Sequence, residues 1–136
     1  MLQLTYISTA QAGMTEAMVG DILTVSRWNN AAAGVTGLLL YDGYRFLQAL
    51  ESDPAEVRAT FDKVKADPRH RAVVVLSQTE VEERAFGDWA MAAQRVAVAQ
   101  GSSLGELVDR LTERVTDLSM QATFRSFARV RTSLAA

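Results

Sequence analysis

The sequence contains no cysteine and a single histidine among its 136 residues. Without cysteine the chain can form no disulfide, no thiolate nucleophile and no zinc site with cysteine ligands. One histidine also removes most metal sites that depend on imidazole. No apolar run approaches the roughly 20 residues that span a bilayer, and the N-terminus lacks the basic region and apolar stretch of a signal peptide. These absences predict a cytoplasmic protein with no membrane contact and no metal ion.

The chain also lacks an excess of either charge, because 14 basic and 16 acidic residues give a net charge of −2. No basic field therefore favours a nucleic-acid partner. The glycine-rich phosphate loops are absent, and so is the G-x-S-x-G turn of many hydrolases. Hydrophobic residues make up 49% of the sequence and charged residues 22%, a composition typical of one globular domain.

Hydrophobic periodicity predicts strands at residues 2–8, on both sides of the Asp42-Gly43 pair, and at 72–76. Asp42-Gly43 is a pair that tolerates positive φ at both centres of a tight hairpin turn. The unbroken β-branched run at 72–76 is of the kind found buried in a sheet. A turn and a small further strand are predicted within 86–91.

Helices are predicted from Thr15, with a stop at Gly34, and from Pro54 to Pro68 with Asp53 as N-cap. The first helix has one apolar stripe whose spacing ends in an amide: Met14, Met18, Ile22, Val25 and Asn29. The resulting order is βαββαβ with one added strand. Two right-handed crossovers then give a ferredoxin-like α+β sheet with both helices on one face.

Beyond Gly101 the sequence predicts two further amphipathic helices, which together form a helical hairpin over residues 101–136. The first has apolar residues in four-three spacing from Leu104 to Leu118, and the second from Met120 to Leu134. Because two helices already cover one face of the sheet, we expect this tail to cover the other. A dimer or partner-docking role is the alternative, and the two roles can coexist.

Gln48 places a primary amide in an apolar row. Phe46, Gln48 and Leu50 share one face of a strand because side chains alternate. A buried amide without partners costs about 1–3 kcal/mol, so Gln48 must be hydrogen-bonded. In the predicted topology the first and third strands are neighbours, which brings Tyr6 beside Gln48. The alternative is a structural glutamine satisfied by backbone or water.

The candidate site residues are amides and a phenol: Tyr6, Asn29, Asn30 and Gln48. Amides present a donor and an acceptor together, so they suit recognition of a ring edge that also presents both. They are poor catalysts of proton transfer, which favours ligand binding over acid–base catalysis. Asn29 and Asn30 have an alternative interpretation as capping residues at a helix end. The lone His70 is read as a surface or ligand-contacting residue.

Five segments, in their order and spacing, resemble the BLUF domain, a blue-light sensor that uses flavin. The resemblance covers about residues 2–95. The segments are LTYIS (4–8), SRWNN (26–30) with GVTGLLLY (34–41), FLQALE (46–51), DPRH (67–70) and FGDWAM (86–91). The resemblance implies a photosensor domain at residues 1–96 and a helical extension at 101–136.

The resemblance also implies an FAD held noncovalently between the two helices, with FMN or riboflavin as substitutes. By position, Asn30 corresponds to the asparagine that holds the carbonyl and imide edge of the flavin. Asn29 falls where family members vary between residues lying against the ring. Arg69 and His70 match the segment near the flavin side chain and the ring rim.

Four residues match the photoactive positions of the family. Tyr6 corresponds to the photoactive tyrosine and Gln48 to the switching glutamine. Trp89 and Met91 match the last strand, where the tryptophan and the methionine exchange proximity to the glutamine. Blue light makes the flavin a strong oxidant, and the phenol supplies an electron and a proton. The glutamine then returns rotated or tautomerised, which shifts absorption slightly to the red.

Two residues depart from the family pattern. Ser52 stands where many relatives have glycine, which alters the turn into the second helix. Trp28 is an unusually bulky residue just before the asparagine pair. It is expected at the surface or in the core, and a competing electron donor is the alternative.

The sequence therefore predicts a stand-alone blue-light photoreceptor that is not an enzyme. Its output is expected to pass through the tail to a separate protein or through a change of oligomer, and a homodimer is predicted. A flavin-free ferredoxin-like hydrolase that uses Arg69 and Asn30 on an anion is the rival reading. A purely structural interaction module is the third.

Overall fold

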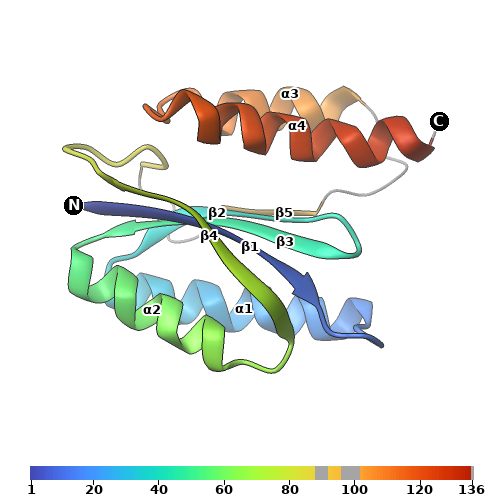
Figure 1. Cartoon of the computed structure of the whole chain (residues 1–136), viewed down its shortest axis with the longest axis horizontal. Coiled ribbons are helices and arrows are strands. Elements are labelled where there is room, and N and C mark those ends of the chain that lie inside the picture. Colours follow the sequence, from blue (N-terminus) through green and yellow to red (C-terminus); the bar gives the residue numbers. More distant parts are fainter. Residues whose placement is uncertain (88–91, 96–101, 136) are drawn as a thin grey trace.

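A computed structural model of the chain describes residues 1–87, 92–95 and 102–135. In this part of the chain, one five-stranded sheet lies between two pairs of helices (Figure 1). The elements are β1 (Leu2–Ala10), α1 (Glu16–Ala33), β2 (Thr36–Tyr41), β3 (Arg45–Ser52), α2 (Pro54–Ala66), β4 (His70–Glu80), β5 (Ala92–Arg95), α3 (Ser102–Leu111) and α4 (Leu118–Ala135).

The strand order is β4-β1-β3-β2-β5, in which β5 pairs parallel to β2 and the other neighbours are antiparallel. Helices α1 and α2 cover one face of the sheet, and α3 and α4 cover the other (Figure 1). The predicted ferredoxin-like α+β fold is confirmed, including the central position of β1 and β3 and the tail on the far face.

Helix α1 begins and ends as its sequence predicts. The Thr15 side chain accepts a hydrogen bond from the Met18 amide, and Gly34 ends the helix in the left-handed conformation at φ 67°. There the Gly34 amide donates back to the Ala31 and Asn30 carbonyls. Ser52, the departure from the family pattern, donates its hydroxyl to the carbonyl of Gly34 at 3.0 Å. Its side chain thus satisfies a polar group at the end of α1.

The apolar stripe predicted for α1 is wrong in the C-terminal half of the helix. Val19, Ile22 and Asn30 form the buried face, whereas Val25 is 51% exposed and Asn29 is exposed. The helix is rotated about its axis relative to the predicted stripe, because Val19 rather than Met18 packs on the sheet. Asn30, not Asn29, is therefore the amide directed inward.

The β2–β3 hairpin differs in detail from the predicted tight turn. Of the Asp42-Gly43 pair only Gly43 has a positive φ, at 90°. Asp42 instead closes a three-residue loop with its side chain, accepting from the Tyr44 and Arg45 amides at 2.8 and 2.6 Å. The loop is therefore closed by hydrogen bonds to the Asp42 side chain, and it needs a left-handed backbone only at Gly43.

Strand β4 is the element that the sequence described least well. It runs over eleven residues instead of the predicted five, and it forms an edge of the sheet. Val74, Val75 and Leu76 are 53%, 38% and 38% exposed. The prediction of a fully buried strand was wrong because β4 lies at the edge of the sheet, where its side chains have a neighbouring strand, β1, on one side only.

Helix α2 starts at Pro54 as predicted. Asp53 occupies the N-cap position, but its side chain makes no capping hydrogen bond. Val57 and Phe61 are the buried residues of this helix, and they face the same layer as the buried residues of α1. The positions of both helix starts thus follow the sequence, although only α1 has a side-chain cap.

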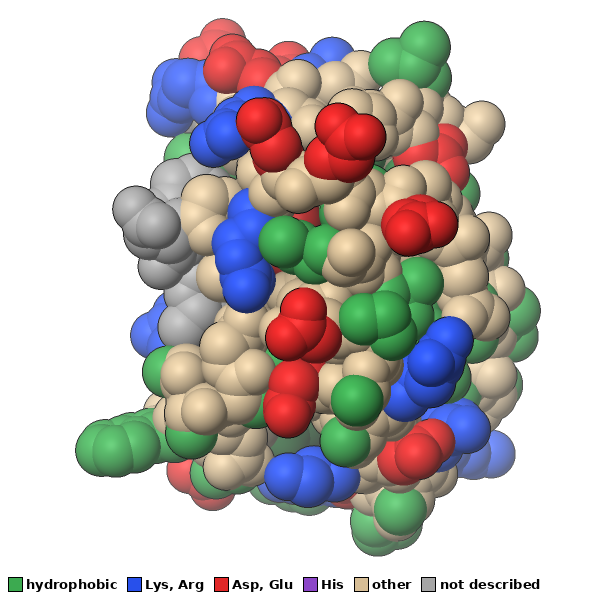
Figure 2. Space-filling model, turned by 90° about the vertical axis from the view of Figure 1, so that its left-hand side faces the viewer, with side chains coloured by type: hydrophobic (Ala, Val, Ile, Leu, Met, Phe, Trp, Pro, Cys, Tyr) green, Lys and Arg blue, Asp and Glu red, His purple; other side chains and the backbone are tan. Residues whose placement is uncertain are grey.

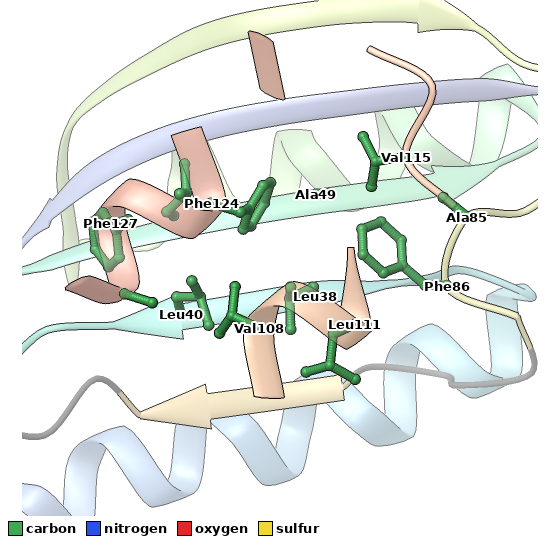
Figure 3. Packing of buried hydrophobic residues seen from close by; sticks show 12 residues of the cluster. Leu38, Leu40, Ala49, Ala85, Phe86, Val108, Leu111, Val115, Phe124 and Phe127 are labelled. Atoms are coloured by element: carbon green, nitrogen blue, oxygen red, sulfur yellow. The ribbon is translucent and has the colours of Figure 1, made fainter. Parts of the chain in front are cut away.

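The sheet separates two hydrophobic clusters. On the α1 and α2 side the cluster is built from residues that include Tyr6, Phe46, Leu50 and Phe61. On the tail side Leu38, Leu40, Leu47 and Ala49 of the sheet meet α3, α4 and the loop before β5 (Figure 3). The residues that the tail and this loop contribute are Ala85, Phe86, Val108, Leu111, Val115, Phe124, Phe127 and Ala128.

Charges of both signs are interspersed on the end of the molecule that Figure 2 shows. This distribution agrees with the small net charge of the sequence. None of the helices in the described ranges combines the length and the apolar character that crossing a bilayer requires.

Candidate functional site

Tyr6 and Gln48 lie directly opposite each other on β1 and β3, on the sheet face that α1 and α2 cover. The Tyr6 hydroxyl donates a hydrogen bond to Oε1 of Gln48. Both side chains are buried, with exposed fractions of 0% and 4%. Burial raises the pKa of Tyr6 above its ordinary value of 10.0, so the phenol is protonated at neutral pH and acts as the donor.

Aromatic rings surround the Tyr6 phenol. The ring centroids of Tyr6 and Phe61 are 5.3 Å apart, and those of Tyr6 and His70 are 6.3 Å apart. Phe46 packs on His70 at 4.7 Å between centroids. These contacts keep water away from the hydroxyl, which strengthens its hydrogen bond to Gln48.

A cleft opens between α1 and α2 above this layer. It encloses about 670 Å³ of space, a figure that includes the part open to solvent. Its lining comes from both helices and from the turn into β4: Ile22, Val25, Ser26, Asn29, Asn30, Ala33, Glu56, Ala59, Thr60, Lys63, Val64, Asp67, Arg69 and His70. The cleft joins apolar walls to a few polar groups, as a site for an amphipathic ring requires.

Asn30 carries the clearest sign of a ligand in this cleft. Its side chain is 2% exposed, and its Nδ2 has no hydrogen-bond partner among the residues that the structure describes. A buried amide nitrogen without an acceptor costs free energy, so such a group calls for a bound acceptor. The carbonyl and imide edge of a flavin ring offers acceptors of this kind, and the residues present therefore fit the expected cofactor. Asn29 lies exposed at the wall of the same cleft.

Arg69 is held at the cleft by Asp67, which the sequence had indicated only as the first residue of the DPRH segment. Its Nη2 lies 2.7 Å from Oδ2 of Asp67, and its Nε donates to both carboxylate oxygens. The hydrogen bond from Arg69 lowers the pKa of Asp67 and raises that of Arg69. Both groups therefore stay charged near neutral pH, and the guanidinium keeps a fixed orientation beside the cleft.

His70 forms a hydrogen bond to Ser8, with 2.8 Å between Nδ1 and Oγ. Burial lowers the pKa of His70 from its ordinary value of 6.5, so the imidazole is neutral at pH 7. Ser8 is buried and was not among the predicted site residues, although its alternation with Tyr6 along β1 placed it on the same face. Lys63 was also missed, because nothing in its sequence context distinguishes it from other surface lysines of α2.

The structure thus brings four predicted residues to the wall of one cleft: Asn29, Asn30, Arg69 and His70. Tyr6 and Gln48 do not line this cleft, but the ring of Tyr6 contacts His70. Trp89 and Met91 lie outside the described residues. Trp28 is 77% exposed and does not line the cleft, in agreement with a surface role. Within the described ranges, the acidic and histidine side chains form no cluster that could hold a metal ion.

Comparison with known proteins decides the family. The family model described as BLUF, "Sensors of blue-light using FAD", matches residues 1–92. The chain belongs to the BLUF family. BLUF proteins are blue-light flavin photoreceptors, and the cleft between α1 and α2 lies in the matched region, as do Tyr6 and Gln48. The flavin-free hydrolase and the purely structural module are not favoured by this result.

A curated BLUF relative is the photoactivated adenylate cyclase subunit beta of Euglena longa. It is 31% identical over 117 residues, which is 85% of this chain and 14% of the relative. The chain thus spans about a seventh of that protein.

Solved BLUF structures show the same fold. The dark state of the BLUF protein BlrB matches with a TM-score of 0.74 and 27% identity, covering 94% of this chain and 95% of BlrB. BlrP1 of Klebsiella pneumoniae with FMN and cyclic diGMP matches with a TM-score of 0.80 and 26% identity, covering 96% of this chain and 35% of that one. The similarity to each structure extends through the tail helices.

Proposed function

We propose that this BLUF chain binds FAD noncovalently in the cleft between α1 and α2 and senses blue light through the Tyr6–Gln48 pair. The observation that carries the proposal is the hydrogen bond between these two buried side chains beside His70, which lines the same cleft as the unpaired amide of Asn30. FMN and riboflavin share the ring system of FAD, so the chain accepts them as substitutes.

Four residues would hold the cofactor. The unpaired Nδ2 of Asn30 would donate to an acceptor on the ring edge, and Asn29 would lie against the ring from the wall of the cleft. Arg69, oriented by Asp67, is available to the polar side chain of the flavin. His70 is neutral and packs on Phe46, which suits contact with the ring rim.

When bound, flavin supplies absorption of blue light and an excited state that is a strong oxidant. Tyr6 is the source of the electron, and its proton leaves along the hydrogen bond to Gln48. When both return to Tyr6, the Gln48 amide keeps its donor and acceptor ends exchanged, by rotation or by tautomerisation. The exchanged amide offers the cofactor a changed hydrogen bond, and absorption shifts slightly to the red. Trp89 and Met91 are proposed to respond to that exchange.

The output is assigned to the tail. Residues 1–96 form the sensing domain and residues 101–136 the extension that passes the signal to a partner or changes the oligomer. The chain itself acts as a sensor without catalysis, located in the cytoplasm, and forms a homodimer. Sedimentation in the dark and under blue light tests this point, and a monomer in both states with no bound partner would contradict it.

An absorption spectrum of the chain reconstituted with FAD, taken before and after blue light, tests the proposed function. The wild type should show a reversible small red shift, and Gln48→Leu should bind flavin without shifting. Gln3→Leu is a matched control because Gln3 is equally buried, at 4%, on the opposite face of the sheet. The proposal fails if the chain binds no flavin, or if Gln48→Leu shifts as the wild type does.

A further inference from the structure

A fully buried carboxylate lies on the tail side of β3. Glu51 has an exposed fraction of 0% and follows Gln48 by three positions on the same strand. Because side chains alternate along a strand, Glu51 points to the opposite face from Gln48. It pairs in register with Gln3 of β1 and Thr36 of β2. A buried charge of this kind is costly unless its environment is built for it.

Four hydrogen-bond donors surround the Glu51 carboxylate. Oε1 accepts from the Thr36 hydroxyl at 2.8 Å and from the Phe86 amide at 2.9 Å. Oε2 accepts from the Ala85 amide at 2.9 Å and from Nε2 of Gln3 at 3.2 Å. A carboxylate offers acceptors only, so it satisfies all four groups, whereas an amide would set its own donor against two of them.

The same contacts attach the loop before β5 to the sheet. Two of the four donors are consecutive backbone amides of that loop. Arg84 adds a third attachment, because its Nη1 donates to the Thr36 hydroxyl at 2.7 Å and to the backbone carbonyl of Glu51 at 3.1 Å. The end of β3 therefore fixes three successive residues of the loop.

Phe86 carries this attachment into the tail. Its side chain is 1% exposed and belongs to the cluster that includes Leu111 of α3 and Phe124 of α4 (Figure 3). Gln48 and Glu51 are thus linked by the backbone of β3, and Glu51 is linked to the loop by hydrogen bonds. Phe86 of the loop is linked to both tail helices by hydrophobic packing. Packed contacts of this kind pass on displacements instead of absorbing them.

On the basis of the proposed function, we propose that Glu51 is a positioning residue that couples the Gln48 strand to the tail. The carboxylate touches neither the cleft nor Tyr6, so it takes no part in the photochemistry itself. It holds residues 84–86 to β3, so that a shift of β3 on illumination moves Phe86 and the helices packed on it.

Glu51→Gln in the full flavin-loaded chain tests this role, with hydrogen exchange and absorption measured in the dark and in blue light. In the dark, at least one of the Ala85 and Phe86 amides should exchange about tenfold faster or more, because glutamine keeps only one of the two acceptor oxygens and carries no charge. The red shift should persist. The light-induced change in exchange of α3 and α4 should disappear.

Two further variants separate coupling from general destabilisation. Gln3→Leu removes one donor from the same carboxylate but leaves both loop amides bound, so it should keep the light response of the tail. Thr36→Val removes a donor and the Arg84 contact at nearly constant volume, and it replaces Glu51→Gln if that variant does not fold. It should weaken the tail response while leaving the red shift intact.

The proposed coupling is overturned if Glu51→Gln, or Thr36→Val in its place, keeps the light response of the tail at the wild-type level. It is also overturned if the loop amides exchange as slowly as in the wild type. A wild-type chain that binds flavin but never shifts would overturn the proposed function, and the coupling with it. That outcome is recognised in the wild-type spectrum before any variant is compared.

Discussion

The Tyr6 hydroxyl donates to Oε1 of Gln48 across neighbouring strands, with both side chains shielded from water. The amide oxygen of Gln48 is therefore the acceptor that faces Tyr6, and this bond fixes the orientation of the amide. Burial raises the pKa of Tyr6, so the phenol is the donor of this hydrogen bond and the Gln48 oxygen is its acceptor. A switch in which the two ends of the amide exchange requires such a defined starting state.

Tyr6→Phe should abolish the red shift while flavin still binds. The variant removes the electron and proton donor and leaves Oε1 of Gln48 without the Tyr6 bond, at a cost of about 1–2 kcal/mol in the free energy of unfolding. Absorption before and after blue light and urea unfolding in the dark measure the two effects. A variant that still shifts would remove Tyr6 from its proposed role.

Asn30→Ala should weaken flavin binding about tenfold, the effect of losing one buried hydrogen bond to the ligand. Quenching of flavin fluorescence during titration measures the dissociation constant. Asn29→Ala makes the same change in the adjacent residue for comparison. Because Asn29 is exposed and is proposed only to lie against the ring, this variant should alter affinity by less than about threefold. Equal losses in the two variants would contradict the assignment of Asn30 to the ring edge.

His70 makes stability fall as pH falls below about 6.5. Burial lowers its pKa in the folded state below the ordinary 6.5, so the unfolded chain binds a proton first and acid favours unfolding. Its contribution is fully present above pH 6.5 and is lost toward the lower folded pKa, by no more than about 1.4 kcal/mol per pH unit for one proton.

Urea unfolding of the apoprotein between pH 7.5 and 5 measures this dependence, with His70→Gln for comparison. The wild type should lose more stability over the interval than the variant does. Asp67 does not contribute to the change measured between pH 7.5 and 5. Its pKa is lowered from 3.8, so its contribution to the free energy of unfolding is lost only at more acid pH. Identical pH profiles for the two proteins would show that His70 titrates normally.

Gly37→Ala should destabilise the protein by about 3 kcal/mol or more. A Cβ at this position of β2 would lie 1.9 Å from the backbone oxygen of Ala49 on β3, and backbone cannot move aside as a flexible side chain can. Urea unfolding measures the change.

Gly20→Ala is the control for that substitution. Gly20 lies within α1, and an added Cβ would have no atom within 4 Å. Alanine also has a higher propensity than glycine for the interior of a helix. This variant should stabilise the protein by about 0.5–1 kcal/mol. A similar loss in both variants would mean that the close approach of β2 and β3 is not the cause.

The sequence by itself determined the order of helices and strands, the limits of α1, and the neighbourhood of Tyr6 and Gln48. These features depend on short-range chemistry, such as the Thr15 cap and the left-handed Gly34, and on the handedness of the crossovers. The residues that resemble the BLUF family lie within the same segments. Their spacing along the chain was therefore sufficient to predict the family.

Only the tertiary structure decided which side chains face which neighbours. The rotation of α1 selected Asn30 over Asn29, and the edge position of β4 left an apolar run exposed. Glu51 had appeared only as the last residue of the FLQALE segment. Its burial became possible because donors from residues 3, 36, 85 and 86 converge on it. Contacts between residues so far apart in sequence leave no local pattern, because they depend on strand order and on loop paths.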